Sequence, residues 1–316
     1  MTQNIRSDPN PILSVIIVSY NVLDALQAGL MLLKPFHDQG KGDVWVIDNA
    51  SRDATADWVE QQQWPHLIRN SENLGFAAAV NQGIERSRGA FILLLNPDTT
   101  ISEAAIKGML TFMDTHEECG IAGVQLLNPD QSLQMSYHYF PTPRSFIAES
   151  LFLNRVKPDE NGFEKPVRVD AVVGACMMIR RTAIERIGLF DERFFLYSEE
   201  LDWCLRARQG GWNVYLLPEV RVIHNLAQSS KDDPGNAFVE LYRSRGLYMD
   251  KHFSNLGRSM VQISFFTGVL LRVILWRMAP WIIRRPDKKN EINLKYSLNK
   301  AVLIWYLAGR PNPHLR

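Results

Sequence analysis

Residues 12–19 read Ile-Leu-Ser-Val-Ile-Ile-Val-Ser, a nearly continuous apolar run that is rich in β-branched side chains. Such a run is typical of a strand that is buried on both faces of a parallel sheet. Two similar runs follow at 43–47 (DVWVI) and 91–95 (FILLL), and between them Phe76, Val80 and Ile84 recur every four residues, as in an amphipathic helix. Strands that alternate with helices imply right-handed crossovers. The sequence therefore predicts an α/β fold with a doubly wound sheet flanked by helices.

Polar residues follow each of these three predicted strands at the point where the strand ends. The three clusters are Ser19-Tyr20-Asn21, Asp48-Asn49-Ala50-Ser51 and Asn96-Pro97-Asp98. Loops are usually polar, so one cluster alone says little. Three clusters at one edge indicate a binding site, because the ligands of open α/β sheets bind at the carboxyl ends of the strands.

The chain of 316 residues has the composition of an ordinary globular protein, with 46% hydrophobic and 22% charged residues. This excludes a disordered, collagen-like or coiled-coil chain, and the net charge of +1 does not point to nucleic acid. Cys119, Cys176 and Cys204 are too scattered for a metal pair or a disulfide framework, so we interpret them as reduced thiols of a cytosolic protein. The first ten residues, MTQNIRSDPN, lack the apolar core of a secretion signal.

The charge is distributed unevenly, since residues 258–316 contain eleven Lys or Arg side chains and two acids. Within this basic tail, residues 259–283 are strongly apolar, but Arg272, Arg277 and Pro280 argue against a helix that spans a membrane. A helix in the membrane interface, with Trp276 and Trp281 at headgroup level, fits better. The same tail contains an apolar stripe, formed by Leu294, Leu298, Ala301, Val302 and Trp305. It also contains a basic cluster, formed by Arg284, Arg285, Lys288 and Lys289. We therefore expect the tail to bind an anionic membrane surface. A helical hairpin packed on the catalytic body or on a second subunit is the alternative.

Two residues far apart in the chain are candidates for a metal site. Asp98 follows a buried strand and a proline, where a carboxylate can hold Mg²⁺ or Mn²⁺ against a diphosphate. It can equally bond its own backbone in a Pro-Asp turn. His224 ends the strand-like run at 220–223 and can complete the metal site, although a lone histidine at a strand end is more often a surface or satisfied side chain.

Three acids open a predicted helix near residue 199. Glu199, Glu200 and Asp202 are favoured in a first turn by the helix dipole, and Asp202 can pair with Arg206 four residues later. A partly buried glutamate beside a second acid has a raised pKa, which suits a general base. Both explanations stay open at this point.

Other segments can contact a nucleotide. Asp48, with Asn49, Ser51 and Asp53, can bind a nucleobase or ribose, or can cap a helix. Asn73 and Gly75 lie where a helix N-terminus can receive a phosphate. Residues 128–168 contain five prolines and are interpreted as a loop-rich excursion over an acceptor side.

Taken together, these segments resemble the family-2 glycosyltransferases of the GT-A fold, and among them the bacterial rhamnosyltransferase-like branch that builds cell-surface polysaccharides. The motifs that carry the resemblance run in order between about residues 11 and 250: 15–21 (VIIVSYN), 46–53 (VIDNASRD), 73–83 (NLGFAAAVNQG), 94–99 (LLNPDT), 174–181 (GACMMIRR) and 190–206 (FDERFFLYSEELDWCLR). The resemblance implies a GT-A mixed sheet and an inverting transfer of a sugar from a nucleoside diphosphate to a hydroxyl.

The resemblance also implies a role for each matching residue. Glu200 falls on the catalytic base, Asp202 and Arg206 organise its helix, and Asp98 and His224 hold Mg²⁺ or Mn²⁺. The donor site is assigned to Ser19, Tyr20, Asn21, Asp48, Asn49, Asn73, Gly75, Asn81, Asn96 and Asp98, and the acceptor side to Gly174, Ala175 and Glu199.

Two residues depart from the usual pattern of the family. Asn96 stands where an Asp-x-Asp element has its first carboxylate, so a metal would depend more on the diphosphate oxygens. Related members share the Asn-Pro-Asp form, so it does not indicate an inactive protein. Glu200 stands where the family often has Asp, which moves the carboxylate by about one bond length without removing its role.

We therefore expect a glycosyltransferase domain at 11–250, with a nucleotide-sugar half at 11–125 and an acceptor and base half at 126–250. A basic amphipathic helical tail at 251–316 follows. The expected partners are a dTDP- or UDP-sugar, with rhamnose favoured, a glycan or lipid-linked acceptor and a membrane surface, and no nucleic acid. The expected location is cytoplasmic, on the inner face of the cell membrane.

Two other functions are compatible with the same fold. A sugar nucleotidyltransferase is disfavoured because no Gly-rich triphosphate loop with a basic residue lies near the N-terminus. A non-catalytic glycan-binding protein is disfavoured by the intact set of Asp98, Glu200, Asp202, Arg206 and His224.

Overall fold

The computed structural model describes residues 11–151, 163–225, 233–282 and 286–310. A mixed sheet forms its centre, with the strand order β3-β2-β1-β4-β10-β6-β11-β5, and β8 pairs with β11. The strands are β1 (Leu13–Ser19), β2 (Gly42–Asp48), β3 (His66–Arg69), β4 (Phe91–Leu95), β5 (Thr99–Thr100), β6 (Cys119–Leu127), β8 (Val167–Arg168), β10 (Cys176–Arg180) and β11 (Asn213–His224). A separate pair consists of β7 (Tyr137–His138) and β9 (Ala171–Val172).

The three strand runs recognised in the sequence are β1, β2 and β4, which lie side by side and parallel. Strand β10 enters antiparallel between β4 and β6, and this makes the sheet mixed. The predicted α/β fold with a mixed, doubly wound sheet is therefore confirmed.

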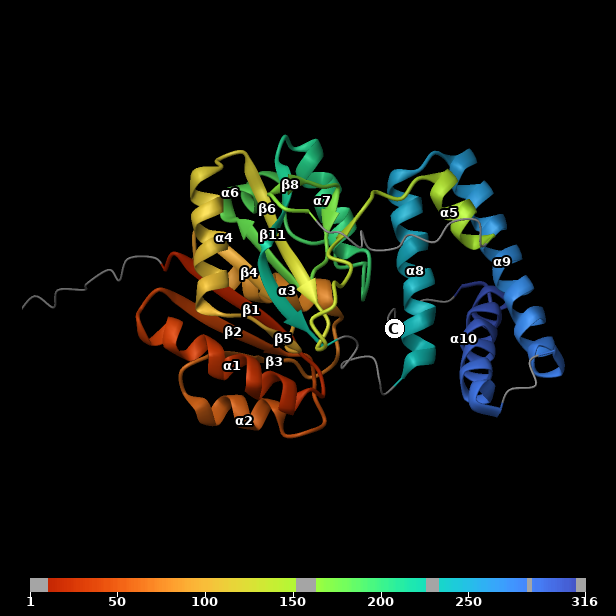
Figure 1. Cartoon of the computed structure of the whole chain (residues 1–316), viewed down its shortest axis with the longest axis horizontal. Helices are drawn as coiled ribbons and strands as arrows, with labels where there is room; N and C mark the ends of the chain where they lie inside the picture. Colours follow the sequence, from red (N-terminus) through yellow and green to blue (C-terminus); the bar gives the residue numbers. More distant parts are fainter. Residues whose placement is uncertain (1–10, 152–162, 226–232, 283–285, 311–316) are drawn as a thin grey trace, which may run out of the picture.

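Helices cover both faces of the sheet (Figure 1). One apolar core joins Leu13, Val15 and Ile17 of β1 to α1 (Leu23–Asp38), α2 (Thr55–Gln62) and α4 (Glu103–Thr115). The other joins Ile16 to α3 (Phe76–Arg86), α6 (Arg181–Ile187) and α7 (Glu199–Gln209). Because successive side chains of a strand point to opposite faces, the continuous apolar run of β1 supplies both cores.

Two segments differ from their sequence-based interpretation. The two short strands expected at 213–217 and 220–223 are one strand, β11, whose pairing with β6 shifts register between Leu217 and Arg221. Pro218 lies in this shift, because proline cannot donate to the ladder and is tolerated at such irregularities. The run at 169–180 is divided into β9 and β10 by a turn that contains Gly174 and Ala175.

A group of helices lies beside the sheet (Figure 1). It consists of α5 (Pro143–Ser150), α8 (Pro234–His252), α9 (Asn255–Ile282) and α10 (Lys289–Leu307), with a short 3-10 turn, η1 (Pro286–Lys288), before α10. Phe146, Tyr242, Val261, Phe265 and Val302 form part of its own apolar core. A C-terminal helical extension is therefore present, and its α9 and α10 pack together as a hairpin.

The predicted division of the chain at residue 250 falls in the last turn of α8. Helix α8 contributes Tyr248 and Met249 to the core of the helical group, so the turn that contains the boundary is itself packed. The division into domains stays a prediction. The predicted features at residues 1–10 and at Arg284 and Arg285 lie outside the described residues.

Candidate functional site

Asp98 and His224, 126 positions apart in the chain, lie in contact at the carboxyl end of the sheet. Thr99 of β5 pairs with His224 of β11, and the backbone N–H of Asn225 donates to the carbonyl of Asp98 at 2.9 Å. The imidazole Nε2 is then 3.3 Å from Oδ1 of Asp98, and both side chains are buried. The short β5 strand is thus the element that joins the two candidate metal ligands.

A carboxylate oxygen and an imidazole nitrogen are suitable ligands for a divalent cation. Among the described residues there is no group of three or more His, Cys, Asp or Glu side chains that could hold a metal ion. Asp98 and His224 can therefore supply two ligands, and the remaining positions would fall to a diphosphate or to water.

Asn96 takes part in this site through its backbone. Its N–H donates to the carbonyl of Ala175 at 2.9 Å, and its own carbonyl accepts from the N–H of Thr99 at 3.1 Å. The turn with Gly174 and Ala175 is thereby held against the turn that carries Asp98. A Cβ atom added to Gly174 would lie 3.8 Å from the Cβ of Glu200. The Gly174–Ala175 turn therefore lies next to both the turn that carries Asp98 and the start of α7 with Glu200.

Glu199, which is buried, and Glu200, which is half-buried, begin α7 as adjacent acids. Tyr197 and Ser198, with φ of 70° and 67°, form the left-handed turn that directs the chain into the helix. Oε2 of each glutamate is buried and has no hydrogen-bond partner among the described residues. Burial, reinforced by the charge of Glu200, raises the pKa of Glu199 well above its usual range. Burial also raises the pKa of Glu200, and the charge of His138 partly opposes it.

A carboxyl group with a raised pKa holds a proton more readily than an exposed glutamate. The two acids cannot both ionise at low cost, since they are buried side by side. The arrangement can therefore keep a proton on Glu199 and leave Glu200 to accept one from a bound hydroxyl. His138, on β7, was not identified from the sequence, because it lies in the segment interpreted as a loop-rich excursion.

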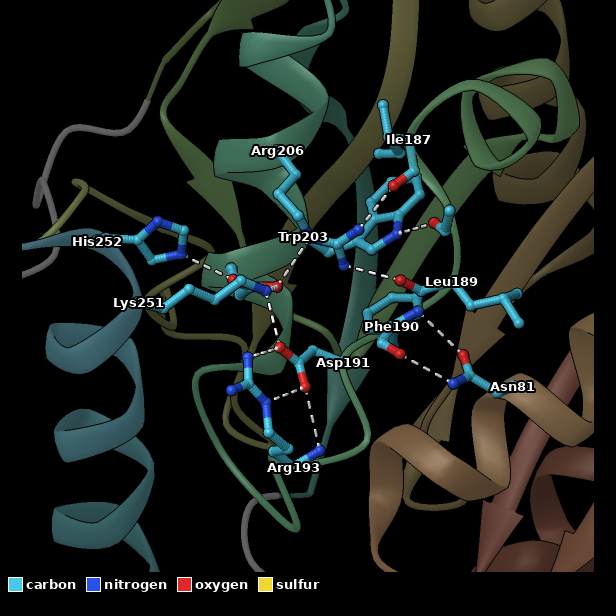
Figure 2. Close-up of polar contacts among 12 residues, drawn as sticks. Asn81, Ile187, Leu189, Phe190, Asp191, Arg193, Trp203, Arg206, Lys251 and His252 are labelled. Carbon is cyan, nitrogen blue, oxygen red and sulfur yellow. Dashed lines mark hydrogen bonds and ion pairs between the residues drawn. The ribbon is translucent and has the colours of Figure 1, made fainter.

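Asp202 contacts Lys251 and His252, two basic side chains that Figure 2 labels at the end of α8. Its carboxylate is fully buried and accepts from Arg206 Nε at 2.9 Å, and it lies 2.8 Å from Lys251 Nζ and 2.7 Å from His252 Nε2. Burial alone would raise the pKa of Asp202, but hydrogen bonds from His252 and Lys251 and the charge of Arg206 hold it below its usual range. Asp202 and Arg206 thus join α7 to α8 and to the segment that precedes α7, and their role in organising a catalytic base stays a prediction. Their assignment as catalytic residues stays a prediction.

The segment that leads into α7 is tied to three helices (Figure 2). Arg206 donates to the carbonyls of Ile187 and Leu189, and Trp203 Nε1 donates to the carbonyl of Gly188. Lys251 of α8 also pairs with Asp191 at 2.8 Å. Lys251 and His252 were not identified from the sequence, because nothing local marks a Lys-His pair at a helix end as the partner of a residue 50 positions away.

Asn81 holds the same segment from α3 (Figure 2). Its Nδ2 donates to the carbonyl of Phe190 and to Glu192 Oε1, both at 2.9 Å, and its Oδ1 accepts from the N–H of Phe190 at 3.0 Å. These bonds use both hydrogens of the amide and join donor-side helix α3 to the base helix. The role of Asn81 in lining the donor pocket stays a prediction.

On the donor side, the ends of β1 and β2 are joined by side chains. Buried Asp48 accepts from Ser19 Oγ at 3.2 Å and from the N–H of Ser51 at 3.0 Å. Asn21, with φ of 52°, accepts from the N–H of Arg52 at 2.7 Å. Tyr20 is half-buried between these contacts. The residues predicted to bind the base therefore lie together at one corner of the sheet.

A second donor-side cluster surrounds the start of α3. Asn49 Nδ2 donates to Asn73 Oδ1 at 2.8 Å, and the N–H of Gly75 donates to the same oxygen. Gly75 has φ of 87°, and a Cβ there would lie within 2.7 Å of Phe195, so only glycine fits. The N–H of Phe76, the first residue of α3, is already taken by the carbonyl of Phe195. The structure brings Asn49, Asn73 and Gly75 together, and phosphate binding there stays a prediction.

Comparisons with known proteins agree with this geometry. The chain is similar to the low-salt glycan biosynthesis hexosyltransferase Agl10 of Haloferax volcanii, with 28% identity over 88% of this chain and 86% of that protein. It is similar to the N-acetylglucosaminyl-diphospho-decaprenol L-rhamnosyltransferase of Mycobacterium tuberculosis, with 26% identity over 72% and 81%. Among solved structures, the mannosyltransferase of Pyrobaculum calidifontis in complex with GDP-Man and Mn²⁺ has the same fold, with a TM-score of 0.56 and 14% identity over 96% of this chain and 89% of that one.

The family model for glycosyl transferase family 2 matches residues 14–188, which hold β1 to β4, the Asn-Pro-Asp turn and the Gly174–Ala175 turn. The relatives that are rhamnosyltransferases agree with the branch that the sequence motifs resemble. Fold, ordered motifs and family match lead to one assignment: the chain is a glycosyltransferase and belongs to glycosyl transferase family 2.

Proposed function

We propose that the protein is an inverting, metal-dependent glycosyltransferase that moves a sugar, in particular rhamnose, from a nucleoside diphosphate to a hydroxyl of a lipid-linked glycan. The observation that carries the proposal is the position of the Gly174–Ala175 turn. Ala175 accepts from the turn that carries Asp98, which contacts His224, and a Cβ on Gly174 would lie 3.8 Å from the Cβ of Glu200. Rhamnose and the lipid-linked acceptor are favoured by the similarity to the decaprenol-linked rhamnosyltransferase.

In the proposed reaction, Glu200 removes the proton of the acceptor hydroxyl. The acceptor oxygen attacks the anomeric carbon from the face opposite to the diphosphate. The bond between that carbon and the diphosphate oxygen breaks, and its electrons leave with the diphosphate. A general base of this kind contributes about 10²–10⁴-fold in rate. Burial raises the pKa of the neighbouring Glu199, so Glu199 keeps its proton. Glu200 can then be ionised without a second negative charge beside it.

A divalent cation fits beside Asp98 and His224, because their ligand atoms face each other 3.3 Å apart in a buried site. Bound there, Mg²⁺ or Mn²⁺ would neutralise charge on the departing diphosphate. Asp48, held by Ser19 and Ser51, is suited to accept from the N–H of uracil or thymine alike. The donor is therefore proposed as a dTDP- or UDP-sugar.

We also propose that the helical extension binds the inner surface of the cell membrane. Helix α9 is the one described helix that is long and apolar enough to cross a membrane, and only 28% of its apolar window is buried. Its exposed apolar residues include a series spaced three or four positions apart: Leu256, Met260, Ile263, Phe266, Leu270, Ile274, Met278 and Trp281. Such a face suits the boundary between headgroups and acyl chains, and Lys288, Lys289 and Lys295 nearby suit anionic lipids.

The experiment that tests the catalytic proposal incubates the full-length chain with dTDP- and UDP-sugars, with and without Mn²⁺ or Mg²⁺, and a lipid-linked glycan. Release of nucleoside diphosphate together with a glycosylated lipid supports it. Release of pyrophosphate would identify a nucleotidyltransferase, and tight glycan binding without turnover would identify a binding protein. Either of these outcomes contradicts the proposal.

A further inference from the structure

Gln134 contacts His224 on the side of the imidazole that faces away from Asp98. Its Oε1 lies 2.7 Å from Nδ1 of His224, whereas Asp98 lies 3.3 Å from Nε2. Both side chains of this contact are buried. The ring nitrogen that does not face Asp98 therefore has one defined partner.

The orientation of the Gln134 amide is determined by its other contacts. Its Nε2 donates to the backbone carbonyl of His224 at 3.2 Å and to Asn128 Oδ1 at 2.9 Å. A carbonyl can only accept, so the amide nitrogen must lie on that side. The amide of Asn128 is oriented in turn, because Ser132 Oγ donates its hydrogen to Asp130 Oδ1 and therefore accepts from Nδ2 of Asn128 at 2.9 Å. The oxygen of Gln134 is thus left to face the imidazole.

An amide oxygen can only accept, so the hydrogen of this bond belongs to Nδ1 of His224. When the imidazole is neutral, a hydrogen on Nδ1 leaves the lone pair on Nε2, the nitrogen that lies 3.3 Å from Oδ1 of Asp98. Two lone pairs that face each other at this distance repel unless a positive charge lies between them. A divalent cation between Nε2 and Oδ1 satisfies both atoms.

A local turn brings Gln134 to this position. The chain reverses after β6, with hydrogen bonds from the N–H of Asn128 to the carbonyl of Ser132 and from the N–H of Gln134 to the carbonyl of Leu126. Strand β11 runs parallel to β6, with Ile223 opposite Leu127, so the returning chain passes directly beside His224. The reversal has no contact with Asp98 among the described hydrogen bonds, and its effect on the metal ligands passes through the histidine.

We propose that Gln134 is a positioning residue for the metal site: it holds His224 in the tautomer and ring orientation that present Nε2 to a divalent cation. The inference rests on the proposed metal site and adds to it a residue outside the ligand set. Partners that orient a metal-binding histidine in this way contribute about 10–100-fold to metal affinity.

The test titrates Mn²⁺ into the full-length chain in the presence of saturating UDP or dTDP and counts free Mn²⁺ by electron paramagnetic resonance. Gln134→Leu is expected to weaken Mn²⁺ binding about 10–100-fold. Gln134→Glu keeps an oxygen acceptor opposite Nδ1 and is expected to recover most of the affinity. Gln125→Leu is the matched control, because Gln125 holds the same reversal through Leu126, Gln134 and Ser136 and has no hydrogen bond to His224. It is expected to bind Mn²⁺ like the parent chain.

A second measurement needs no variant at Gln134. The measurement records long-range ¹H–¹⁵N spectra of the chain labelled with ¹⁵N at histidine. The signals of His224 are assigned by their loss in the His224→Gln variant. They are expected to show that the hydrogen of this imidazole is on Nδ1. A hydrogen on Nε2 alone would overturn the inference. A Mn²⁺ affinity of Gln134→Leu within twofold of the parent affinity would overturn it as well. Neither result would remove the proposed metal site. Equal Mn²⁺ binding by the parent chain and Asp98→Ala instead removes the metal site itself, and the inference with it.

Discussion

Glu199 and Glu200 are adjacent in the chain and have different surroundings. Glu199 is almost fully buried, and its pKa is raised by burial and then by the charge of Glu200. Glu200 is half-buried and has the charge of His138 beside it, which lowers its pKa relative to burial alone. Neighbouring acids whose environments separate their pKa values are a recurrent arrangement for proton transfer. The helix dipole accounts for acids at this position, but not for their burial.

Glu200→Gln is expected to lower kcat by about 10²–10⁴-fold, because the amide cannot take the proton of the acceptor. Donor binding is expected to stay within about twofold, since Glu200 is proposed to contact the acceptor hydroxyl and not the diphosphate. Initial rates with saturating donor and acceptor, and donor binding by calorimetry, measure the two effects separately. Near-normal turnover of the variant would falsify the role of Glu200.

Glu199→Gln is expected to stabilise the fold at neutral pH. The folded-state pKa of Glu199 is raised above the unfolded value, so the acid costs nothing below about pH 4.5 and destabilises the fold increasingly as the pH rises above it. A neutral amide of the same shape removes that cost. Thermal unfolding at pH 4 and pH 7 should therefore show a higher Tm for the variant at pH 7 and a smaller difference at pH 4. An equal difference at both pH values would mean that Glu199 is not the titrating group.

At the scale of elements, α7 is held in place by α8 rather than by the sheet alone. The carboxylate of Asp202 on α7 contacts the side chains of Lys251 and His252 on α8. The hydroxyl of Ser244 on α8 donates to the carbonyl of Leu196, in the segment that leads into α7. Helix α9 begins three residues after His252. The base helix, the preceding segment and the start of the helical extension therefore form one connected structure.

Asp202→Asn is expected to destabilise the fold by about 3–5 kcal/mol, because it removes the buried counter-charge of Arg206 and leaves Lys251 with Asp191 alone. The pKa of Asp202 is lowered in the fold, so its contribution is present above the unfolded value and is lost as the pH falls below it. The difference between parent and variant in denaturant unfolding should therefore shrink in acid.

Asp250→Asn is the control for this change. Asp250 lies on α8, next to Lys251, and pairs with Arg258, but both partners are more than a third exposed, so a cost below about 1 kcal/mol is expected. If the two variants lose the same stability, the cluster around Asp202 does not hold the elements together in the way described.

At the scale of the whole molecule, the active-site edge of the sheet and the apolar face of α9 belong to one connected body. Helix α9 packs against α5 and α10 on one side, and its other side has apolar residues that are 47–80% exposed, among them Ile263, Ile274 and Trp281. Monomeric soluble proteins rarely expose such a continuous apolar face. A lipid-linked acceptor would reach the enzyme from the membrane surface that this face is proposed to bind.

The triple variant Ile263→Glu, Ile274→Glu and Met278→Glu is expected to abolish flotation of the full-length chain with anionic vesicles. The substitutions place charges where apolar side chains are proposed to enter the membrane. Met31→Glu, at an exposed methionine of α1, is the control and should float like the parent chain. Flotation of the triple variant at the parent level would exclude α9 as the membrane-binding face.

The sequence alone determined where the central strands lie in the chain and which residues form them. β1, β2 and β4 could be predicted because each is a local run of apolar residues, and a strand buried on both faces leaves that pattern wherever it occurs. The polar clusters at their carboxyl ends could be predicted for the same reason, since strand polarity is read along the chain. The motifs from Val15 to Arg206 were enough to indicate the family.

Only the tertiary structure decided which distant residues meet. His224 reaches Asp98 through the short strand β5, Gln134 reaches His224 through the reversal after β6, and Asp202 meets Lys251 across the space between α7 and α8. These contacts depend on the order of strands in the sheet and on the packing of helices, which are long-range properties without a local signal. A side chain's residue type sets what it can bind, and its position in the folded chain sets what it does bind.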